Sequence, residues 1–310
     1  MENKEWLAIQ NFASQNLGWL ISSGHRACSG CGAVGGLKLV LDALGPEAII
    51  VIPASCTSVY SGLFPFSALK VPVVHTPFAS AAATASGIAR MLRRQNRPGV
   101  VTCWGGDGGT LDIGFQALSG ACERGEDFIY ICYDNEAYMN TGIQRSSATP
   151  CGAWTSTTPL PIVKTEPKKD IDAILAAHRI SYIATINAAF LDDFYRKVKT
   201  AKGKSGTRFL HLCSPCPPGW KYDPRYSVKL SRLAVLSCFS PLFEVEGGRK
   251  WALSFDPGDK KASVAEYFGV GRDWSQDRFA HLGVADIEKI QKDVDDAWEE
   301  LKEKCKKKEG

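Results

Sequence analysis

The fold of this chain follows from one segment, 99-GVVTCWGGDGGTLDIGFQALSGACERGEDFIYICYDNEAYMN-140. It contains two short and almost wholly apolar runs, Gly99–Trp104 and Phe128–Tyr133, separated by a glycine-rich turn and a helical pattern over Asp112–Arg124. Apolar runs of this length, bounded by turn residues, are typical of strands that are covered on both faces. A strand, a helix and a second strand in this order predict a parallel pair with a crossover helix.

The same alternation of apolar runs and helical patterns extends over most of the chain. The predicted strands are Ala48–Pro53, Val71–His75, Gly99–Trp104, Phe128–Tyr133, Ser181–Ile186 and Arg208–Leu212. The predicted helices are Ala33–Leu44, Ala79–Arg94, Asp112–Arg124, Asp170–His178 and Ala188–Ala201. This regular alternation predicts an α/β fold with a doubly wound parallel sheet.

Three other segments depart from the alternation. Pro150–Lys168 is rich in Thr, Pro and Lys and predicts a long ordered loop, and Pro217–Gly258 predicts an irregular stretch. Ala285–Lys308 predicts a charged amphipathic helix, because apolar residues recur at three- and four-residue spacing, at Ile287, Ile290, Val294, Trp298 and Leu301. We therefore expect an α/β domain over residues 1–230 and a C-terminal extension over 231–310, whose helix packs on the core or on a partner subunit.

Composition narrows the class of protein. The 310 residues include 37 Lys and Arg against 33 Asp and Glu, and a net charge of +4 is too weak to indicate a nucleic-acid partner. No apolar stretch reaches the roughly 18 residues that a membrane-spanning helix needs. The N-terminal sequence MENKEWLAIQNF lacks the apolar core of a secretory signal. These features predict a soluble protein of the cytoplasm.

Two groups of polar residues follow neighbouring predicted strands. Gly105-Gly106-Asp107-Gly108-Gly109 comes directly after the first strand of the opening segment, and Asp134-Asn135-Glu136 comes directly after the second. Carboxyl ends of parallel strands share one edge of a sheet, so both groups are expected at one crevice. Glycines there let backbone N–H groups approach a phosphate, and an aspartate among them requires a divalent cation such as Mg²⁺. Either group alone is also compatible with an ordinary turn.

The segment GDGGTLDIGFQALSGACERGEDFIYICYDNEAYMNTGIQRSSATP, at residues 106–150, resembles the β subunit of thiamine-diphosphate-dependent 2-oxoacid:ferredoxin oxidoreductases of the pyruvate synthase type. The resemblance covers roughly residues 20–225 and implies the diphosphate-binding half of a thiamine-diphosphate fold. The residues that it implies for the cofactor are Gly106, Asp107, Gly108, Gly109, Asn135 and Ala137, with Mg²⁺ on Asp107, Asn135 and the carbonyl of Ala137, and with Asn140 facing the reacting carbon.

Eleven cysteines, in a chain whose start predicts no secretory signal, favour metal or redox chemistry over disulfides. Cys28-Ser-Gly-Cys31 alone is compatible with zinc, an iron–sulfur cluster or a redox pair. Cys56 follows the predicted strand Ala48–Pro53, and Cys213 and Cys216 follow Arg208–Leu212. We therefore expect these thiols at the same edge of the sheet as the diphosphate site.

The resemblance narrows the cysteine assignment. HxxCxGCG at residues 25–32 and CPxGW at residues 216–220 match the cluster segments of the family, and they imply a [4Fe–4S] cluster on Cys28, Cys31, Cys56 and Cys216. Cys213 stays a rival of Cys216. Around Cys56 the chain reads Pro-Ala-Ser-Cys-Thr-Ser, which departs from the Gly-Cys-Leu-Glu expected in the family and points to a substrate subclass. The other cysteines are expected to be unligated.

The resemblance also implies a reaction and a set of partners. The expected reaction is the oxidative decarboxylation of pyruvate to acetyl-CoA and CO₂, with electrons passing through the cluster to ferredoxin in an anaerobic cell. Thiamine activation needs a glutamate that no segment of this chain evidently supplies. The resemblance implies that an α subunit provides it, beside γ and δ or fused γδ subunits, so the isolated chain is expected to be inactive.

Other functions stay open at this stage. Oxalate, cleaved to two CO₂ without coenzyme A, is the main alternative substrate, and pyruvate is favoured by the segments SSATP and GAWT. Branched-chain, 2-oxoglutarate and indolepyruvate enzymes rank lower. A non-redox thiamine decarboxylase would leave four gathered cysteines without a role, and a zinc-stabilised binding module would leave the Asp107–Asn135 pair unexplained.

Arg145 is expected either to contact an anion or to pair with an acidic residue. His211 is expected to be a structural residue.

Overall fold

The computed structural model describes residues 20–306. Eight strands form one sheet in the order β2–β1–β3–β4–β6–β5–β7–β8. The first six of these are mutually parallel, whereas β7 runs antiparallel to β5 and β8 antiparallel to β7. The strands are β1 (Ala48–Pro53), β2 (Val73–Thr76), β3 (Val100–Gly106), β4 (Ile129–Asp134), β5 (Tyr182–Asn187), β6 (Arg208–Cys213), β7 (Phe243–Glu246) and β8 (Lys250–Leu253). The predicted parallel sheet is confirmed, with each predicted strand at its expected place.

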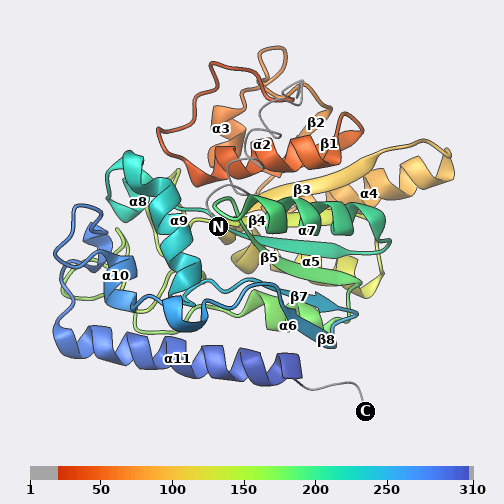
Figure 1. Ribbon diagram of the computed structural model, residues 1–310. Helices are drawn as coiled ribbons and strands as arrows, with labels where there is room; N and C mark the ends of the chain where they lie inside the picture. The colour runs from red at the N-terminus through yellow and green to blue at the C-terminus, as the bar shows by residue number, and fades with distance from the viewer. Residues whose placement is uncertain (1–19, 307–310) are drawn as a thin grey trace, which may run out of the picture.

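Helices cover both faces of the sheet, as predicted (Figure 1). On one face lie α2 (Gly32–Leu44) and α7 (Leu191–Gly203), which contact each other. On the other face lie α4 (Ala81–Arg94), α5 (Phe115–Glu123), α6 (Ile171–Ala177) and the C-terminal part of α11 (Val284–Lys306). The crossover helices are needed because parallel strands can be joined only across a face of the sheet.

Strand β4 shows why the central strands read as continuous apolar runs. Ile129 and Ile131 point into the core on the α2 and α7 side, and Tyr130 and Cys132 point into the core on the opposite side. Successive strand residues face opposite sides, so a strand with helices on both sides must be apolar at every position. All four residues are 2% exposed or less.

The C-terminal region is more ordered than the sequence predicted. Pro217–Gly258 was expected to be irregular, but it contains α8 (Pro217–Trp220), α9 (Ser227–Leu236) and the β7–β8 hairpin, so this prediction was wrong. The β7 sequence FEVE buries Phe243 and Val245 only because the strand pairs with β5. Such a short element has too weak a period to be read without its partner. The boundary expected at residue 230 falls within α9.

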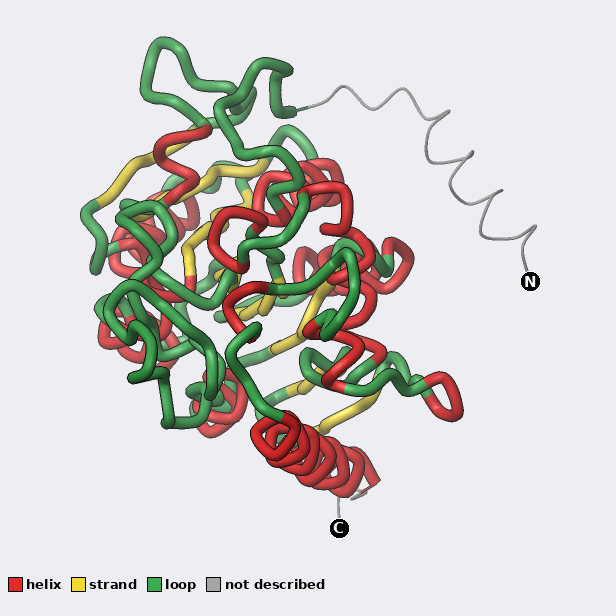
Figure 2. The backbone as a smooth tube through the Cα atoms, turned by 90° about the vertical axis from the view of Figure 1, so that its left-hand side faces the viewer, coloured by secondary structure: helices red, strands yellow, loops and turns green. Residues whose placement is uncertain are grey.

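A third apolar cluster joins α8, α9, α10 (Val264–Phe268) and the first half of α11. It lies beside the carboxyl ends of the strands, on the left of Figure 1, and α11 crosses below the sheet. Figure 2 faces this side of the molecule, where loops cover much of the surface. Residues 150–168 belong to these loops and form turns without a helix or long strand, as predicted.

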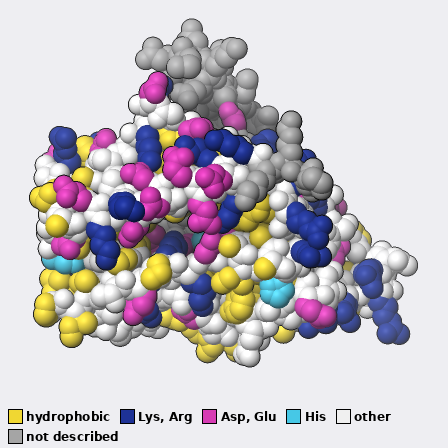
Figure 3. Space-filling view, turned by 90° about the horizontal axis from the view of Figure 1, so that it is seen from below, with side chains coloured by type: hydrophobic (Ala, Val, Ile, Leu, Met, Phe, Trp, Pro, Cys, Tyr) yellow, Lys and Arg dark blue, Asp and Glu magenta, His cyan; other side chains and the backbone are white. Residues whose placement is uncertain are grey.

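The face seen from below carries acidic and basic side chains side by side rather than a patch of one sign (Figure 3). On α11 several of these form ion pairs one turn apart, including Lys292 with Asp296 and Lys304 with Glu300. Among residues 20–306, no helix combines the length and the apolar character needed to cross a bilayer. The N-terminal sequence used for the secretory-signal prediction and the last two residues of the predicted helix Ala285–Lys308 lie outside the described residues.

Candidate active site

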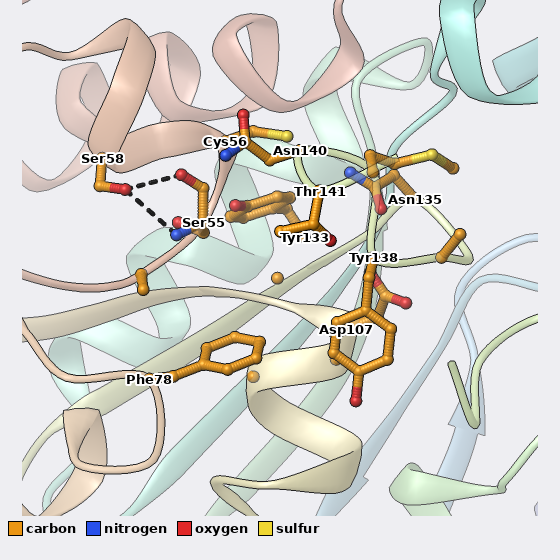
Figure 4. Close-up of a pocket in the computed structure, with 16 residues that line it drawn as sticks. Ser55, Cys56, Ser58, Phe78, Asp107, Tyr133, Asn135, Tyr138, Asn140 and Thr141 are labelled. Atoms are coloured by element: carbon orange, nitrogen blue, oxygen red, sulfur yellow. Dashed lines mark hydrogen bonds between the residues drawn. The ribbon is translucent and has the colours of Figure 1, made fainter. Parts of the chain in front are cut away.

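A cavity of about 250 Å³ opens at the carboxyl ends of β1, β3 and β4. Figure 4 shows Cys56 and Asn140 at the top of this cavity and Phe78 and Tyr138 at its bottom. The structure brings together there all the residues that were predicted for the thiamine cofactor, namely Gly106, Asp107, Gly108, Gly109, Asn135, Ala137 and Asn140. We name this space the cofactor cavity.

Strand register explains why the two polar groups meet. Gly106 at the end of β3 is paired with Tyr133 near the end of β4. The chain therefore leaves both strands at the same level, with Asp107 on one side and Asp134 and Asn135 on the other. Asp107 begins a short π-helical turn over Gly108–Asp112, so its carboxylate stays at the edge of the sheet.

Gly108 is required by a close approach of an aromatic ring. A Cβ atom at this position would lie 2.3 Å from Cε1 of Tyr138, which no real side chain tolerates. The Tyr138 hydroxyl donates a 2.7 Å hydrogen bond to Asp112, and this bond holds the ring over the glycine. The Gly-Asp-Gly turn and the Asn135–Asn140 segment are thus packed directly against each other.

Three oxygen atoms face one another at the edge of the cofactor cavity. The side-chain oxygen of Asn135 lies 2.9 Å from Oδ1 of Asp107 and 2.9 Å from the carbonyl oxygen of Ala137. With the amide turned over, its nitrogen would donate to both oxygens instead. Adjacent oxygen ligands of an octahedral Mg²⁺ at about 2.1 Å lie about 3.0 Å apart. The observed spacing therefore fits a bound Mg²⁺, with the amide oxygen facing the ion.

The ionised form of the Asp107 side chain would be stabilised by a nearby positive charge. Its side chain is buried, and the Ser146 hydroxyl donates to it over 2.5 Å. Burial and the neighbouring Asp134 raise the pKa of the Asp107 carboxyl well above its usual range. A divalent cation at the three-oxygen site would reverse this effect, because it stabilises the ionised form.

Behind the cofactor cavity lies a network of paired charges. Asp134 binds Lys168 over 2.5 Å and His211 over 3.0 Å, and His211 binds Asp172 over 2.7 Å. Burial lowers the pKa of His211, but the carboxylates of Asp172 and Asp134 outweigh it and raise that pKa to about 10. Both ring nitrogens of His211 are therefore occupied by carboxylates, which agrees with its expected structural role.

A second cavity of about 270 Å³ is lined by Cys28, Cys31, Cys56 and Cys216, the four cysteines predicted for the cluster. We name it the cysteine cavity. It adjoins the cofactor cavity, because both are lined by Cys56, Asn135, Met139 and Asn140. Three peptide segments far apart in the sequence thus bring four thiols to the side of the cofactor cavity.

Cys213 lies elsewhere. It pairs with Asp134 in the β4–β6 register and lines a small cavity with Asp134, Lys168 and His211. Three residues later the chain has left the sheet, and Cys216 is the N-cap residue of α8. The structure therefore groups Cys216, and not Cys213, with the other three thiols.

The thiols of the cysteine cavity are hard to ionise without a cation. Burial, together with the charges of Cys31 and Cys28, raises the pKa of Cys56 to about 12. Burial also raises the pKa of Cys216 to about 12, although the backbone N–H of Gly219 opposes this. Metal-bound cysteines are thiolates, so iron binding would displace the protons of these thiols.

Two of the four cysteines lie at the start of a helix. Cys31 is the N-cap residue of α2, and Cys56 is the first residue of α3 (Cys56–Tyr60). The Ser58 side chain closes the first turn of α3, because its hydroxyl accepts from the Ser55 N–H and donates to the Ser55 carbonyl (Figure 4). A thiolate at a helix N-terminus is favoured by the backbone N–H groups of the first turn.

Comparison with known proteins identifies the family. The model of the thiamine pyrophosphate enzyme C-terminal TPP binding domain matches residues 54–212. Pyruvate synthase subunit PorB of Methanothermobacter thermautotrophicus is 44% identical over 286 residues, which cover 91% of this chain and 97% of the relative. Ketoisovalerate oxidoreductase subunit VorB of Pyrococcus horikoshii is 45% identical over 289 residues, which cover 90% of this chain and 91% of the relative. The chain belongs to the 2-oxoacid:ferredoxin oxidoreductase β subunits.

A solved structure shares the fold of this β subunit. It is a 2-oxoglutarate:ferredoxin oxidoreductase from Magnetococcus marinus with 2-oxoglutarate, coenzyme A and succinyl-CoA bound. The two superimpose with a TM-score of 0.55 at 20% identity, over 69% of this chain and 79% of that chain. The predicted family, enzyme class and fold are thus confirmed. These relatives give no support to the oxalate alternative, and their similar identities do not separate pyruvate from ketoisovalerate.

Several residues of the β-subunit site escaped prediction. Phe78 and Thr141 line the cofactor cavity. Glu136 lies between Asn135 and Ala137 and pairs with Arg278, and Trp220 donates to the Asn135 carbonyl. Glu136 belongs to the Asp134-Asn135-Glu136 group that was expected at this crevice, and Trp220 belongs to the CPxGW segment, but their contacts were not predicted. Arg145 pairs with Glu166 over 3.1 Å, which is the acid-pairing alternative of its two predicted roles. None of the described residues that line the cofactor cavity is a glutamate.

Proposed function

We propose that this chain holds thiamine diphosphate and Mg²⁺ in the cofactor cavity and a [4Fe–4S] cluster in the cysteine cavity. The observation that carries the proposal is the shared wall of the two cavities, formed by Cys56, Asn135, Met139 and Asn140. Such contact suits an enzyme in which electrons leave the cofactor for an adjacent cluster. A non-redox thiamine enzyme has no use for four thiols at this wall.

The residues divide into three functional groups. Asp107, Asn135 and the Ala137 carbonyl would hold Mg²⁺, since one end of the Asn135 amide already lies 2.9 Å from Oδ1 of Asp107 and 2.9 Å from the Ala137 carbonyl. The backbone N–H groups of the Gly106–Gly109 turn would face the diphosphate. Asn140, on the wall between the cavities, would orient the carbonyl of the 2-oxoacid. Bound thiamine diphosphate supplies the electron sink that permits loss of CO₂.

Pyruvate is the proposed substrate, with acetyl-CoA and CO₂ as products and ferredoxin as the electron acceptor. The pyruvate synthase relative matches almost its entire length to this chain, and the SSATP and GAWT segments favour the same substrate. Ketoisovalerate is the second candidate, because a relative named for it is equally similar. A branched substrate would need a wider cavity, part of which the partner subunit would form.

A complete site requires other chains. A β subunit implies a multisubunit enzyme, and we propose that an α subunit carries the glutamate that activates the thiamine ring. Further γ and δ or fused γδ subunits would relay electrons to ferredoxin. A cytoplasmic location in an anaerobic cell fits an oxygen-sensitive cluster and a ferredoxin acceptor.

Metal, sulfide and thiamine analysis of the complex, purified anaerobically through this chain, tests the proposal. We expect a brown protein with iron and sulfide at [4Fe–4S] stoichiometry and one thiamine diphosphate per chain. Bleaching of the visible absorbance by pyruvate, but not by ketoisovalerate, would identify the substrate. Zinc without thiamine would overturn the proposal, and thiamine without iron would leave a non-redox decarboxylase.

A further inference from the structure

We propose that Glu136, Arg278 and Trp220 form a clamp that sets the geometry of the cation-binding turn. The C-terminal part of the chain would thereby belong to the cofactor-binding apparatus. This inference rests on the proposed magnesium site and names positioning residues for it. None of the three side chains is a proposed ligand, and all act through the backbone of residues 135–137.

The turn has an unusual backbone at its centre. Glu136 has a φ of +71°, a left-handed conformation that residues other than glycine, Asn and Asp rarely adopt. It stands between Asn135 and Ala137, whose oxygens form two of the three corners of the cation site. The left-handed residue reverses the chain locally, and this reversal allows the Asn135 side chain and the Ala137 carbonyl to face the same point. A relaxed Glu136 would separate those oxygens.

The side chain of Glu136 is held on two sides. Its carboxylate is buried and pairs with Arg278 over 2.6 Å and with Lys168 over 3.2 Å. Its backbone N–H donates to Asp134, and its carbonyl accepts from the Thr149 hydroxyl over 2.6 Å. Every polar group of Glu136 thus has a partner that opposes rotation out of the left-handed conformation.

Arg278 is a fixed rather than a mobile partner. It is 3% exposed, and its guanidinium donates to Gln276 through both Nε and Nη2, over 3.1 and 2.9 Å. The same guanidinium lies 3.9 Å from the centre of the Trp220 ring. A buried arginine that is hydrogen-bonded through all three nitrogens and stacked on a ring defines one position for the carboxylate that it binds.

Trp220 secures the other end of the turn. Its indole N–H donates a 2.8 Å hydrogen bond to the carbonyl of Asn135, and its ring is fully buried. It is the last residue of α8, which begins directly after Cys216. Trp220 therefore connects the segment that presents a cluster thiol to the segment that presents two magnesium ligands.

Binding of Mn²⁺, measured by electron paramagnetic resonance on the complex stripped of metal and thiamine diphosphate, tests the clamp without reference to turnover. We expect Arg278→Met to weaken Mn²⁺ binding about 10- to 100-fold, as loss of a supporting contact does at other metal sites. Trp220→Phe keeps an aromatic ring beside Arg278 but removes the pyrrole part of the indole and its one hydrogen bond, so a smaller loss is expected. Trp220→Phe also provides a readout if the complex with Arg278→Met does not assemble.

Arg208→Met is the matched control, because Arg208 is an equally buried arginine at the opposite end of β6. It should lower the melting temperature and leave Mn²⁺ affinity unchanged. Equal Mn²⁺ affinities of the Arg278 and Arg208 variants would overturn the clamp and leave Arg278 a structural residue. A wild-type complex that bound neither Mn²⁺ nor thiamine diphosphate would instead refute the proposed function.

A second pair of variants isolates the backbone effect. Glu136→Ala and Glu136→Gly both remove the carboxylate, but only glycine adopts a positive φ without strain. If the clamp works by holding this conformation, Glu136→Gly should bind Mn²⁺ more tightly than Glu136→Ala. Equal affinities would show that the carboxylate acts only through its charge, and would refute the positioning role.

Discussion

At the scale of single residues, two cysteines three positions apart have different surroundings. Cys213 is the last residue of β6, beside Asp134 and Lys168, whereas Cys216 lines the cysteine cavity with Cys28, Cys31 and Cys56. The difference arises because the chain leaves the sheet after Ser214, whose N–H still donates to the Asp134 carbonyl over 2.9 Å. This change of direction thus separates a residue that lies beside the charge network from a proposed iron ligand.

Cys216→Ser should remove most of the cluster iron and the visible absorbance, because the serine oxygen is a poor replacement for a thiolate ligand. Cys213→Ser is the natural control and should retain both. Anaerobic iron analysis and absorption spectra of the two purified complexes provide the measurement. Iron loss in the Cys213 variant alone would reverse the assignment.

At the scale of elements, His211 joins three of them. It lies on β6, and its two ring nitrogens contact Asp134 at the end of β4 and Asp172 on α6. The carboxylates favour the protonated ring, so the folded state holds this proton more tightly than the unfolded chain does. His211 therefore contributes to stability as a charged link between the sheet and a covering helix.

Because the folded state binds the His211 proton more tightly, the contribution of His211 to stability depends on pH. The unfolded pKa is near 6.5 and the folded pKa is about 10, so the contribution is complete below pH 6.5 and lost as pH rises toward 10. The difference in free energy of unfolding between wild type and His211→Gln should fall over this range by about 1–3 kcal/mol. Denaturant titrations at pH 6, 8 and 10 measure it. A constant or growing difference would contradict a raised pKa.

Helix α11 contributes to the same core through its apolar stripe. Trp298 is 5% exposed and packs into the cluster on the α4, α5 and α6 side of the sheet. Trp298→Ala should therefore destabilise the protein by about 3 kcal/mol. Lys292→Ala, on the exposed side of the same helix, should cost less than about 0.5 kcal/mol. Thermal or denaturant unfolding compares the two, and equal losses would mean that α11 does not stabilise the core.

At the scale of the whole molecule, the proposed function makes this chain one side of a reaction site. Its cofactor cavity contains the proposed magnesium ligands and a glycine turn, and among the described lining residues Asp107 is the only acid. Under the proposed function, thiamine activation by a glutamate then depends on the assembly of subunits. The fold places the incomplete cavity at the edge of the sheet, where a second chain has access.

The chain purified alone should oxidise pyruvate more than about 100-fold more slowly than the assembled complex, since a positioned general acid–base typically contributes this much. Adding the purified α subunit should restore activity, and adding a variant that lacks its activating glutamate should not. Ferredoxin reduction under anaerobic conditions is the measurement. Full activity of the lone chain would contradict the shared site.

Much of this architecture was predictable from local sequence. The alternation of apolar runs and helical patterns is a property of neighbouring residues, and it correctly predicted the parallel sheet and both covering layers. Residues that directly follow strands, such as Asp107 and Asn135, could be placed at one edge because strand direction fixes that edge. The resemblance then grouped the cysteines that the structure brings to one cavity.

Only the tertiary structure decided the contacts between distant segments. Glu136 and Arg278 are 142 residues apart, and neither α9 nor the β7–β8 hairpin has enough apolar periodicity to be read without the surfaces that it covers. The sequence by itself determined which elements form and at which edge their chemistry lies, because these depend on local pattern and chain direction. The bend that directs Cys216, and the partners that hold Glu136 in a left-handed conformation, depend on packing between segments that only the folded chain brings together.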